Sequence, residues 1–350
     1  MPRLLQRILA SFVPAVLAGC MSATPPPPAA YHNPVLDTDF PDPAVLSASD
    51  GAYYAYATQG NGRNIQMARS RDLKRWEVLG DALPVKPDWA SRTQDFWAPH
   101  VHEAAGRYYL YYSAKPDAAL DDPEQGLCLA VATAERPEGP FTDMGRPLLC
   151  GPGFVNIDPF AYDDPATGKT LLYWGSGFGP IKVQELGPDR LSFAPGSKPH
   201  ELIQPIRSDD PADYGRLIEG AWITLRNGWY YLFYSGDNCC GPNAHYATMV
   251  ARSRSATGPF ERFTGGTGTR GDVILEAGTR WNAPGHNSVV SDRSGRYWIV
   301  YHAVDRERPR AKPQDELNTR RVMLINRLEW VDGWPRVAKN ESLLGEPFGK

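Results

Sequence analysis

The stretch GAYYAYAT at 51–58 recurs four more times, as GRYYLYYSA at 106–114, GKTLLYWGS at 168–176, GWYYLFYSG at 228–236 and GRYWIVYHA at 295–303. The leading glycines are 55, 62, 60 and 67 residues apart. Aromatic and β-branched strands with a period near 60 residues, and no long helical periodicity between them, indicate a radial repeat of small sheets. Because five such units fill the chain, we predict an all-β fold, a five-bladed β-propeller.

A second pattern follows several of these strands and supports the same fold. An apolar strand, a polar turn and an aromatic residue occur in sequence, as expected for the outer two strands of a four-stranded blade. The segments are IQMARSRDLKRWE at 65–77, LCLAVATAERPEGPF at 127–141 and ATMVARSRSATGPF at 247–260. IKVQELGPDRLSF at 181–193 keeps the strand with a changed turn, and VMLINRLEW at 322–330 is assigned to the last unit. A β-sandwich is the alternative, but it would lack the longer period.

The N-terminus predicts export. Arg3 and Arg7 precede an apolar run that is too short for a membrane-spanning helix and ends in Leu-Ala-Gly-Cys20, which resembles a bacterial lipobox. We therefore expect a lipoprotein-type signal peptide at 1–19, a Pro-rich tether at 20–30 and the propeller as the catalytic domain at 31–350. The protein is then lipid-anchored to the bacterial cell envelope, periplasmic or at the cell surface. An ordinary cleaved signal with an incidental Cys20 is the alternative.

Charge and cysteine content narrow the class of partner. Residues 1–19 hold two of the 37 basic residues and none of the 40 acidic ones, so the remainder has a net charge of −5. Scattered basic residues on an acidic chain argue against nucleic acid as a binding partner. We expect contact with the membrane only through the N-terminal lipid anchor. In an exported protein we favour a Cys128–Cys150 disulfide, and leave Cys239 and Cys240 open between a vicinal disulfide and free thiols. Without a CxxC spacing, a zinc site is not expected.

The repeat also locates residues near the propeller axis. Counting back nine or ten positions from each glycine gives Asp42, Trp97, Asp158, Glu219 and His286. The innermost strand of each blade lines the axis, so these side chains are expected to converge there. A repeat selected only for packing would place apolar or small residues at such positions.

Three carboxyl groups facing one cavity cannot all ionise freely, so their pKa values must move apart. One protonated and one ionised carboxyl group are what glycosidic hydrolysis requires, and a third acidic neighbour can keep the acid protonated. Most aromatic residues near these segments are expected in the core. We assign Phe40 and Trp97 as substrate-binding residues on which sugar rings stack.

Five segments resemble glycoside hydrolase family 43, the arabinanase, α-L-arabinofuranosidase and β-xylosidase group. They are NPVLDTDFPDPAV at 33–45, DFWAPHV at 95–101, NIDPFAYDD at 156–164, LIEGAWI at 217–223 and APGHNSVV at 283–290. Together they extend over nearly all of the chain after residue 30. The resemblance implies a five-bladed propeller that hydrolyses its substrate with inversion at the anomeric carbon.

The resemblance also implies roles for individual residues. Asp42 is expected to be the general base, Glu219 the general acid, and Asp158 the residue that raises the pKa of the acid and orients it. His286 matches a histidine that in several relatives helps hold a hydrated calcium, so a structural calcium on the axis is a possible cofactor, with none required for the chemistry. Arg321 matches a basic residue that reaches the sugar in some members.

Other readings of these residues remain open from the sequence. Aspartate before proline often only initiates a turn, which applies to Asp42 and Asp158. Asp37 and Asp39 compete for the base role but fall out of register. His100 and His102 share a strand face and are a weaker candidate metal pair.

For the function we predict cleavage of α-L-arabinofuranosyl linkages in plant polysaccharides or oligosaccharides such as arabinan and arabinoxylan. A β-D-xylosidase of the same family is the alternative. A surface propeller that binds sugar without cleaving it, and a partner-binding propeller with a large apolar patch, are alternatives from other classes. The sequence does not decide between endo and exo action.

Overall fold

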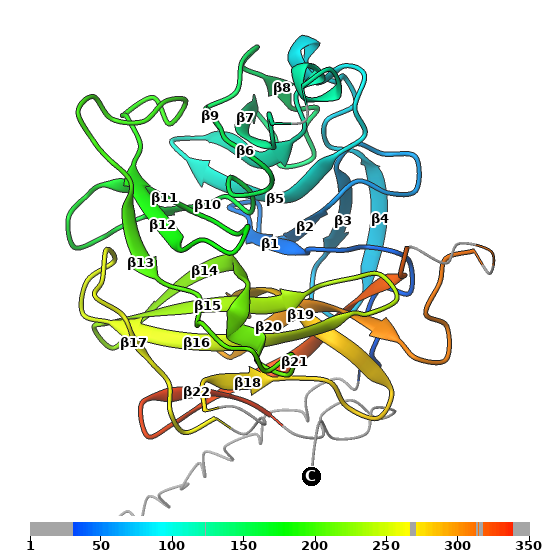
Figure 1. Cartoon of the computed structure of the whole chain (residues 1–350), viewed down its shortest axis with the longest axis vertical. Coiled ribbons are helices and arrows are strands. Elements are labelled where there is room, and N and C mark those ends of the chain that lie inside the picture. The colour runs from blue at the N-terminus through cyan, green and yellow to red at the C-terminus, as the bar shows by residue number, and fades with distance from the viewer. Residues whose placement is uncertain (1–30, 123, 267–270, 313, 315–317, 339–350) are drawn as a thin grey trace, which may run out of the picture. The chain divides into compact units, whose positions relative to one another are not determined.

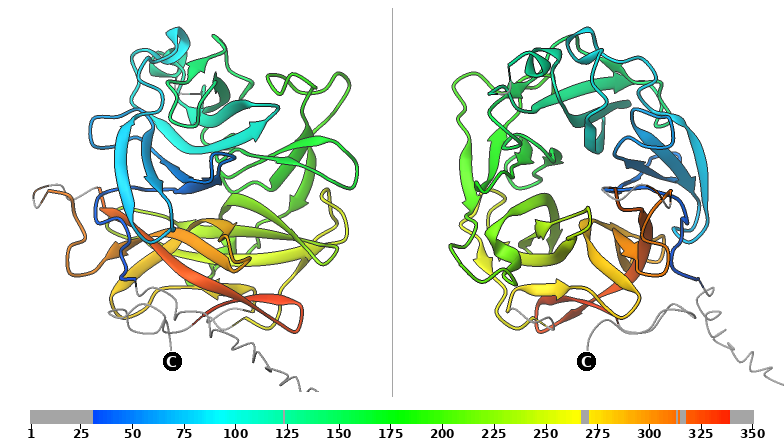
Figure 2. Two further views of the ribbon diagram at one scale, coloured as in Figure 1. Left: turned by 180° about the vertical axis from the view of Figure 1, so that it is seen from behind. Right: turned by 45° about the vertical axis from the view of Figure 1, so that its right-hand side comes forward.

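The computed structural model describes residues 31–338, except 123, 267–270, 313 and 315–317. The predicted signal peptide, Cys20 and the predicted tether lie outside this range. The described residues form five antiparallel sheets and three short 3-10 helices, without an α-helix (Figure 1). Viewed from another side, the sheets of this part surround a central axis (Figure 2). The fold is the predicted five-bladed β-propeller, and the β-sandwich alternative is wrong.

Each blade is a meander of four strands, and two blades have one extra short strand. Blade 1 is β1 (Ala44–Ser47), β2 (Tyr53–Ala57), β3 (Gln66–Ser70) and β4 (Trp76–Asp81). Blade 2 is β5 (Phe96–Ala104), β6 (Arg107–Ala114), β7 (Cys128–Ala134) and β8 (Thr142–Asp143), with β9 (Leu149–Cys150) paired to β7. Blade 3 is β10 (Phe160–Asp163), β11 (Thr170–Trp174), β12 (Ile181–Glu185) and β13 (His200–Ile203).

Blade 4 is β14 (Ile218–Arg226), β15 (Trp229–Asn238), β16 (His245–Ser253) and β17 (Glu261–Arg262), with β18 (Val273–Leu275) paired to β16. Blade 5 is β19 (Trp281–Ser291), β20 (Tyr297–Asp305), β21 (Arg321–Val331) and β22 (Trp334–Val337). The 3-10 helices are η1 (Asp88–Ala90), η2 (Asp117–Leu120) and η3 (Tyr214–Arg216). No helix among the described residues has the length and apolar character needed to cross a membrane.

The glycine-led stretches form the second strand of every blade, and they build the core. Each contributes a tyrosine without exposed surface, namely Tyr56, Tyr112, Tyr173, Tyr234 and Tyr301. The hydroxyl of each of these five tyrosines donates a hydrogen bond to a backbone or side-chain oxygen. Buried tyrosines of this kind add apolar area without leaving a polar group unpaired, which is why aromatic strands suit the space between blades.

Hydrogen bonds between neighbouring blades form what we call the axial ring. The first strand of each blade is preceded by, or contains, a residue with positive φ: Asp42, Ala98, Asp158, Gly220 and His286. In three cases its N–H donates to a hydroxyl of the preceding blade, in Thr58, Ser113 or Ser235. The N–H of Asp42 donates to Nδ1 of His302 at 3.0 Å, which links blade 1 to blade 5. The N–H of Gly220 departs from this pattern and donates to the carboxylate of Asp158 at 3.0 Å.

The chain closes the propeller by joining its first described segment to the last blade. The side-chain amide of Asn33 donates to the carbonyl of Ile325 at 2.8 Å, and the N–H of Ile325 donates back at 3.0 Å. The N–H of Phe40 donates to the carbonyl of Arg321 at 2.7 Å. We call these contacts the seam, because they connect blade 1 to blade 5 without a covalent bond.

The second sequence pattern corresponds to the third strands of the blades. The segments at 65–77, 127–141 and 247–260 supply the third strand and lead into the fourth, as predicted, and 322–330 lies within β21. In blade 3 the fourth strand is β13, later than Phe193, which forms only an isolated bridge with Leu186. Cys128 and Cys150 are bonded and join β7 to β9, which confirms the favoured pairing.

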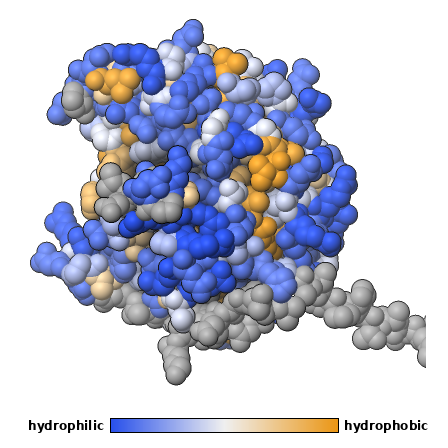
Figure 3. All heavy atoms as spheres, turned by 90° about the vertical axis from the view of Figure 1, so that its right-hand side faces the viewer, coloured by the Kyte–Doolittle hydropathy of each residue, from blue (hydrophilic) through white to orange (hydrophobic). Residues whose placement is uncertain are grey.

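The described surface has no strong apolar character. The large apolar side chains that are most exposed are scattered, namely Val78, Val85, Leu120, Phe178, Ile206 and Val331. The face shown in Figure 3 is mostly hydrophilic, with small hydrophobic areas between polar ones. This distribution offers no support for the partner-binding alternative, which requires a large contiguous apolar patch.

Candidate active site

A cleft of about 1380 Å³ lies where the five blades meet. Every blade contributes to its wall, and all five residues predicted to surround the axis line it: Asp42, Trp97, Asp158, Glu219 and His286. Its volume exceeds the roughly 300–1,000 Å³ typical of a small-ligand pocket, so it has room for more than one sugar. The convergence predicted from the repeat is therefore present in the structure.

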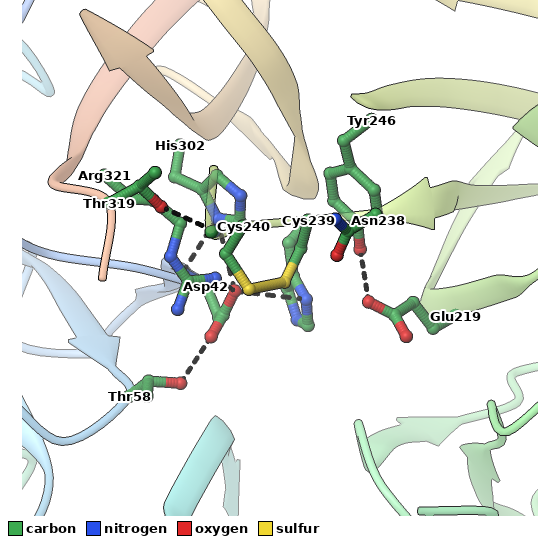
Figure 4. Close-up of a disulfide and its surroundings, with 12 residues drawn as sticks. Asp42, Thr58, Glu219, Asn238, Cys239, Cys240, Tyr246, His302, Thr319 and Arg321 are labelled. Atoms are coloured by element: carbon green, nitrogen blue, oxygen red, sulfur yellow. Dashed lines mark hydrogen bonds and ion pairs between the residues drawn. A yellow bond between two sulfur atoms is a disulfide. The ribbon is translucent and has the colours of Figure 1, made fainter. Parts of the chain in front are cut away.

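Asp42 is held from three sides. Its Oδ2 accepts a hydrogen bond from the hydroxyl of Thr58 at 2.5 Å, and its Oδ1 accepts one from Nη1 of Arg321 at 2.9 Å (Figure 4). Burial by itself would raise the pKa of Asp42, but the charge of Arg321, together with His286 and His302, lowers that pKa well below its ordinary value. Asp42 is therefore an ionised carboxylate at neutral pH.

Glu219, in contrast, has neutral hydroxyl neighbours. Its two carboxyl oxygens accept hydrogen bonds from the hydroxyls of Ser176 at 2.6 Å and Tyr246 at 2.8 Å. Burial raises the pKa of Glu219, the two hydroxyl donors lower it in part, and the negative charge of Asp42 raises it further. The result is a carboxyl group with increased proton affinity, only 8% exposed, that faces the same cleft as Asp42.

Asp158 completes the acidic cluster. Its N–H donates to Ser113 at 3.0 Å, and its Oδ2 accepts a hydrogen bond from the N–H of Gly220, the residue that follows Glu219. Burial raises the pKa of Asp158 well above its ordinary value, and the charges of Glu219 and Asp42 raise it further. Asp158 and Glu219 therefore share a preference for protonation, while Asp42 stays ionised.

The histidines near the axis face carboxylates. Nδ1 of His286 lies 3.6 Å from Oδ1 of Asp42 and 3.8 Å from Oδ2 of Asp158. Burial lowers the pKa of His286, and Asp42 offsets this in part. Burial likewise lowers the pKa of His302 to about 4. A neutral ring can use Nδ1 to accept the hydrogen bond from the N–H of Asp42.

The side chains around His286 supply few direct ligands for calcium, so a hydrated ion there would be held largely through water. Calcium takes six to eight oxygen ligands. Within the described residues, no group of three or more His, Cys, Asp or Glu side chains has an arrangement that could hold a metal ion. We therefore derive no catalytic step from a metal ion.

Two of the predicted substrate-binding residues lie in the cleft and the third does not. Trp97, half-buried in β5, and Arg321, at the start of β21, both line it. Phe40 has no exposed surface and packs in a core cluster that includes Leu36 and Trp298. The assignment of Phe40 to sugar stacking is wrong, because a ring enclosed by the core presents no face to a ligand.

The competing candidates take structural roles. Asp37 forms ion pairs with Arg308 and Arg320 and does not line the cleft. Asp39 lines it, but its Oδ1 accepts a hydrogen bond from the N–H of Arg321.

His100 and His102 also have separate partners. The ring of buried His100 accepts a hydrogen bond from the N–H of Ala161. His102 instead pairs with Asp163 at 3.1 Å. The two rings do not form a shared metal site.

The predicted register is off by one residue in blades 2 and 4. The five positive-φ residues occupy equivalent positions in their blades, so Ala98 and Gly220 are the residues that match Asp42. Trp97 and Glu219 each lie one residue before that position. Blades 2 and 4 have two-residue hairpin turns at their glycines, such as Asn227–Gly228, and a bulge in the first strand. The offset lets Gly220 bond Asp158 while Glu219 extends toward Ser176 and Tyr246.

The sequence prediction missed the hydrogen-bond partners of the carboxyl groups. These partners lie at nearly the same distance after the glycine of their repeat, which is seven residues for Thr58 and His302 and eight for Ser176. Ser113 and Ser235 occupy the same position, so a polar residue recurs in all five blades where most neighbours are aromatic. That recurrence is a signal the sequence contained. Tyr246, which lies in β16, gives no comparable signal.

An open cleft in which the pKa of one carboxyl group is lowered and that of another is raised is the arrangement that glycosidic hydrolysis uses. Residues 31–335 match the model of glycosyl hydrolases family 43. The chain belongs to this family and is a glycoside hydrolase.

Two curated relatives extend over most of the chain. Arabinan endo-1,5-alpha-L-arabinosidase C of Emericella nidulans is 32% identical over 308 residues, which are 83% of this chain and 88% of the relative. The extracellular exo-alpha-(1->5)-L-arabinofuranosidase ArbA of Cellvibrio japonicus is 27% identical over 321 residues, 87% of each chain. One relative is thus named for internal cleavage and the other for cleavage from a chain end.

A solved structure supports the fold independently. The crystal structure of a thermostable family-43 glycoside hydrolase aligns with a TM-score of 0.71 and 28% identity. The alignment covers 91% of this chain and all of the other. This chain therefore shares its fold with a family-43 glycoside hydrolase of known structure.

Proposed function

We propose that this glycoside hydrolase degrades arabinan by cleaving α-L-arabinofuranosyl linkages with inversion at the anomeric carbon. The observation that carries the proposal is the pairing in one cleft of Asp42, whose pKa is lowered, with Glu219, whose pKa is raised. Relatives named for arabinan and arabinofuranosyl cleavage supply the substrate class.

In the proposed mechanism Asp42 is the general base. An ionised carboxylate held by Arg321 and Thr58 can accept a proton from a water molecule as that water attacks the anomeric carbon. Glu219 is the general acid and donates its proton to the departing glycosidic oxygen. The hydroxyls of Ser176 and Tyr246 fix the plane of its carboxyl group, so the proton is delivered in one direction.

Asp158 is a positioning residue in this scheme. Its Oδ2 holds the N–H of Gly220, and through this bond it fixes the backbone that carries Glu219. The negative charge of Glu219 raises the pKa of Asp158, and because a charge interaction is reciprocal, an ionised Asp158 raises the pKa of Glu219. Asp158 thus acts through the acid.

The test is a product analysis on linear arabinan, sugar-beet arabinan, arabinoxylan, xylo-oligosaccharides and matched aryl glycosides. We expect arabinose or arabino-oligosaccharides, and NMR of the first product should show the opposite anomeric configuration to the substrate. Release of xylose alone would favour the β-D-xylosidase alternative. A product of retained configuration would contradict the assignment of Asp42 as a base, and binding without any release would favour the non-catalytic alternative.

We also propose export with a lipid anchor at Cys20. Support comes from the Arg3 to Cys20 segment and from a relative described as extracellular. Cys20→Ser should move the protein from the membrane fraction to the soluble fraction. Unchanged partitioning would contradict the anchor.

The structural calcium near His286 stays a separate prediction. Metal analysis of the purified protein, before and after dialysis against a chelator, tests it directly. The absence of stoichiometric calcium in protein purified without chelator would contradict it.

A further inference from the structure

The wall of the cleft contains an unusual apolar element. Cys239 and Cys240, adjacent in sequence, are joined by a disulfide. Both cysteines line the same cleft as Asp42 and Glu219, and both are partly exposed. In the view of Figure 4 the sulfur–sulfur bond is drawn between the labelled side chains of Asp42 and Glu219.

The loop that carries this disulfide is held in place at both ends. It connects β15 to β16, whose last pair is Asn238 with His245. The side chain of Asn238 donates to the carbonyl of Asn243 at 3.1 Å, and the N–H of Gly241 donates to the hydroxyl of Thr319 at 3.2 Å. The disulfide therefore reaches the cleft from a loop anchored within blade 4 and to the segment that precedes β21.

The pair belongs to the apolar part of a mixed wall. The cleft is lined by polar residues such as Asp39 and Lys86 and by apolar ones such as Trp97 and Phe178. Two bonded sulfurs provide a polarisable surface that makes weak hydrogen bonds at most. A sugar ring has hydroxyl groups on its rim and C–H groups on its faces, and the latter require such an apolar surface.

We propose that the Cys239–Cys240 disulfide is a specificity-determining wall of the sugar site, which contacts the C–H face of the sugar whose anomeric carbon lies between Asp42 and Glu219. The inference rests on the proposed function and names a contact within that site. The bond between neighbouring residues restricts the loop to few conformations, so the sulfur surface is already in position before the sugar binds.

The test compares two double variants. Cys239→Ala/Cys240→Ala removes the sulfur wall, and Cys128→Ala/Cys150→Ala is the matched control, because that disulfide joins β7 to β9 and does not line the cleft. With 4-nitrophenyl α-L-arabinofuranoside, we expect the first variant to raise KM about tenfold and to change kcat less. The control should keep the wild-type KM, even where its melting temperature falls.

A binding measurement separates contact from loop stability. In the Glu219→Gln background, removal of Cys239 and Cys240 should weaken arabinobiose binding by a factor similar to the change in KM. A lower melting temperature with unchanged KM and Kd would show that the disulfide only stabilises the loop, and would overturn the proposal.

A crystal structure of Glu219→Gln with arabinobiose gives a readout that does not depend on whether the double variants fold. A sugar carbon should lie within about 4 Å of a sulfur. Bound sugar without this contact would overturn the proposal and leave the proposed function intact. A wild-type protein that cleaves and binds no arabinoside would overturn both.

Discussion

Asp42 and Glu219 face the same cleft but have opposite surroundings. Asp42 contacts a guanidinium group, a hydroxyl and a histidine of the last blade. In the described structure, the carboxyl group of Glu219 accepts hydrogen bonds only from hydroxyl groups, those of Ser176 and Tyr246. Both carboxyl groups are buried, so burial does not distinguish them.

The difference shows that the neighbours decide which carboxyl group keeps its proton. A cation within hydrogen-bonding distance offsets the desolvation of Asp42, and its pKa falls. Hydroxyl donors offset less of the desolvation of Glu219, and its pKa stays raised. A base and an acid therefore arise from similar side chains, and the following substitutions test that division.

Asp42→Ala should have the largest effect. A base is needed whatever the leaving group, so we expect losses of at least about a hundredfold in kcat for both natural oligosaccharides and aryl arabinofuranosides. Steady-state kinetics on the two substrate types measures this. The control is Asp37→Asn, at an acidic residue outside the cleft, which should retain most of the activity. Near-normal activity of Asp42→Ala on either substrate would contradict the base role.

Glu219→Ala should separate the two substrates. A departing sugar alkoxide needs a proton and an activated phenolate does not, so hydrolysis of arabino-oligosaccharides should be nearly abolished while aryl glycosides with acidic phenols keep far more activity. The measurement is kcat/KM across a series of phenols of different acidity. Equal losses on all substrates would exclude Glu219 as the acid.

Asp158→Asn should have an intermediate effect and move the pH profile. Activity is lost as pH rises through the pKa of the general acid, because the acid must be protonated. Asp158 and Glu219 interact, so whenever Asp158 is ionised its negative charge raises the pKa of Glu219. Asp158→Asn removes that charge, and the basic limb of the profile should shift to lower pH. A basic limb that does not move would show that Asp158 only fixes the backbone at Gly220.

Tyr246→Phe should have the smallest effect, with the opposite sign. The hydroxyl of Tyr246 stabilises the ionised form of Glu219, so its loss should raise the pKa of the acid and move the basic limb to higher pH. We expect a loss in kcat of only a few-fold, because the hydrogen bond from Ser176 remains. A shift to lower pH would contradict the account of this environment.

The repeat period made the blades and the meeting point of the axial residues predictable. Each glycine marks a hairpin turn, so counting from it locates the start of the first strand. The count was off by one for Trp97 and Glu219, because a two-residue hairpin and a bulge are not visible in the spacing. Phe40 was misassigned because proximity to Asp42 in sequence does not determine the side to which a ring points.

The electrostatic environment could not be predicted in the same way. Ser176 and Tyr246 approach Glu219 from blade 3 and from another strand of blade 4, and Arg321 approaches Asp42 from blade 5. Such contacts depend on how the sheets pack around the axis. The pairing of Cys239 with Cys240 also required coordinates, because adjacent cysteines are compatible with both states.

The seam also determines how the propeller responds to mechanical tension. The first described segment runs antiparallel to β21, with Asn33 paired to Ile325 and Phe40 bonded to Arg321. A pull on the chain upstream of Tyr31 therefore acts first on the contacts of Tyr31 with Trp298 and then on the bonds of Asn33, before it reaches Phe40. The seam has to separate before such a force displaces Asp42.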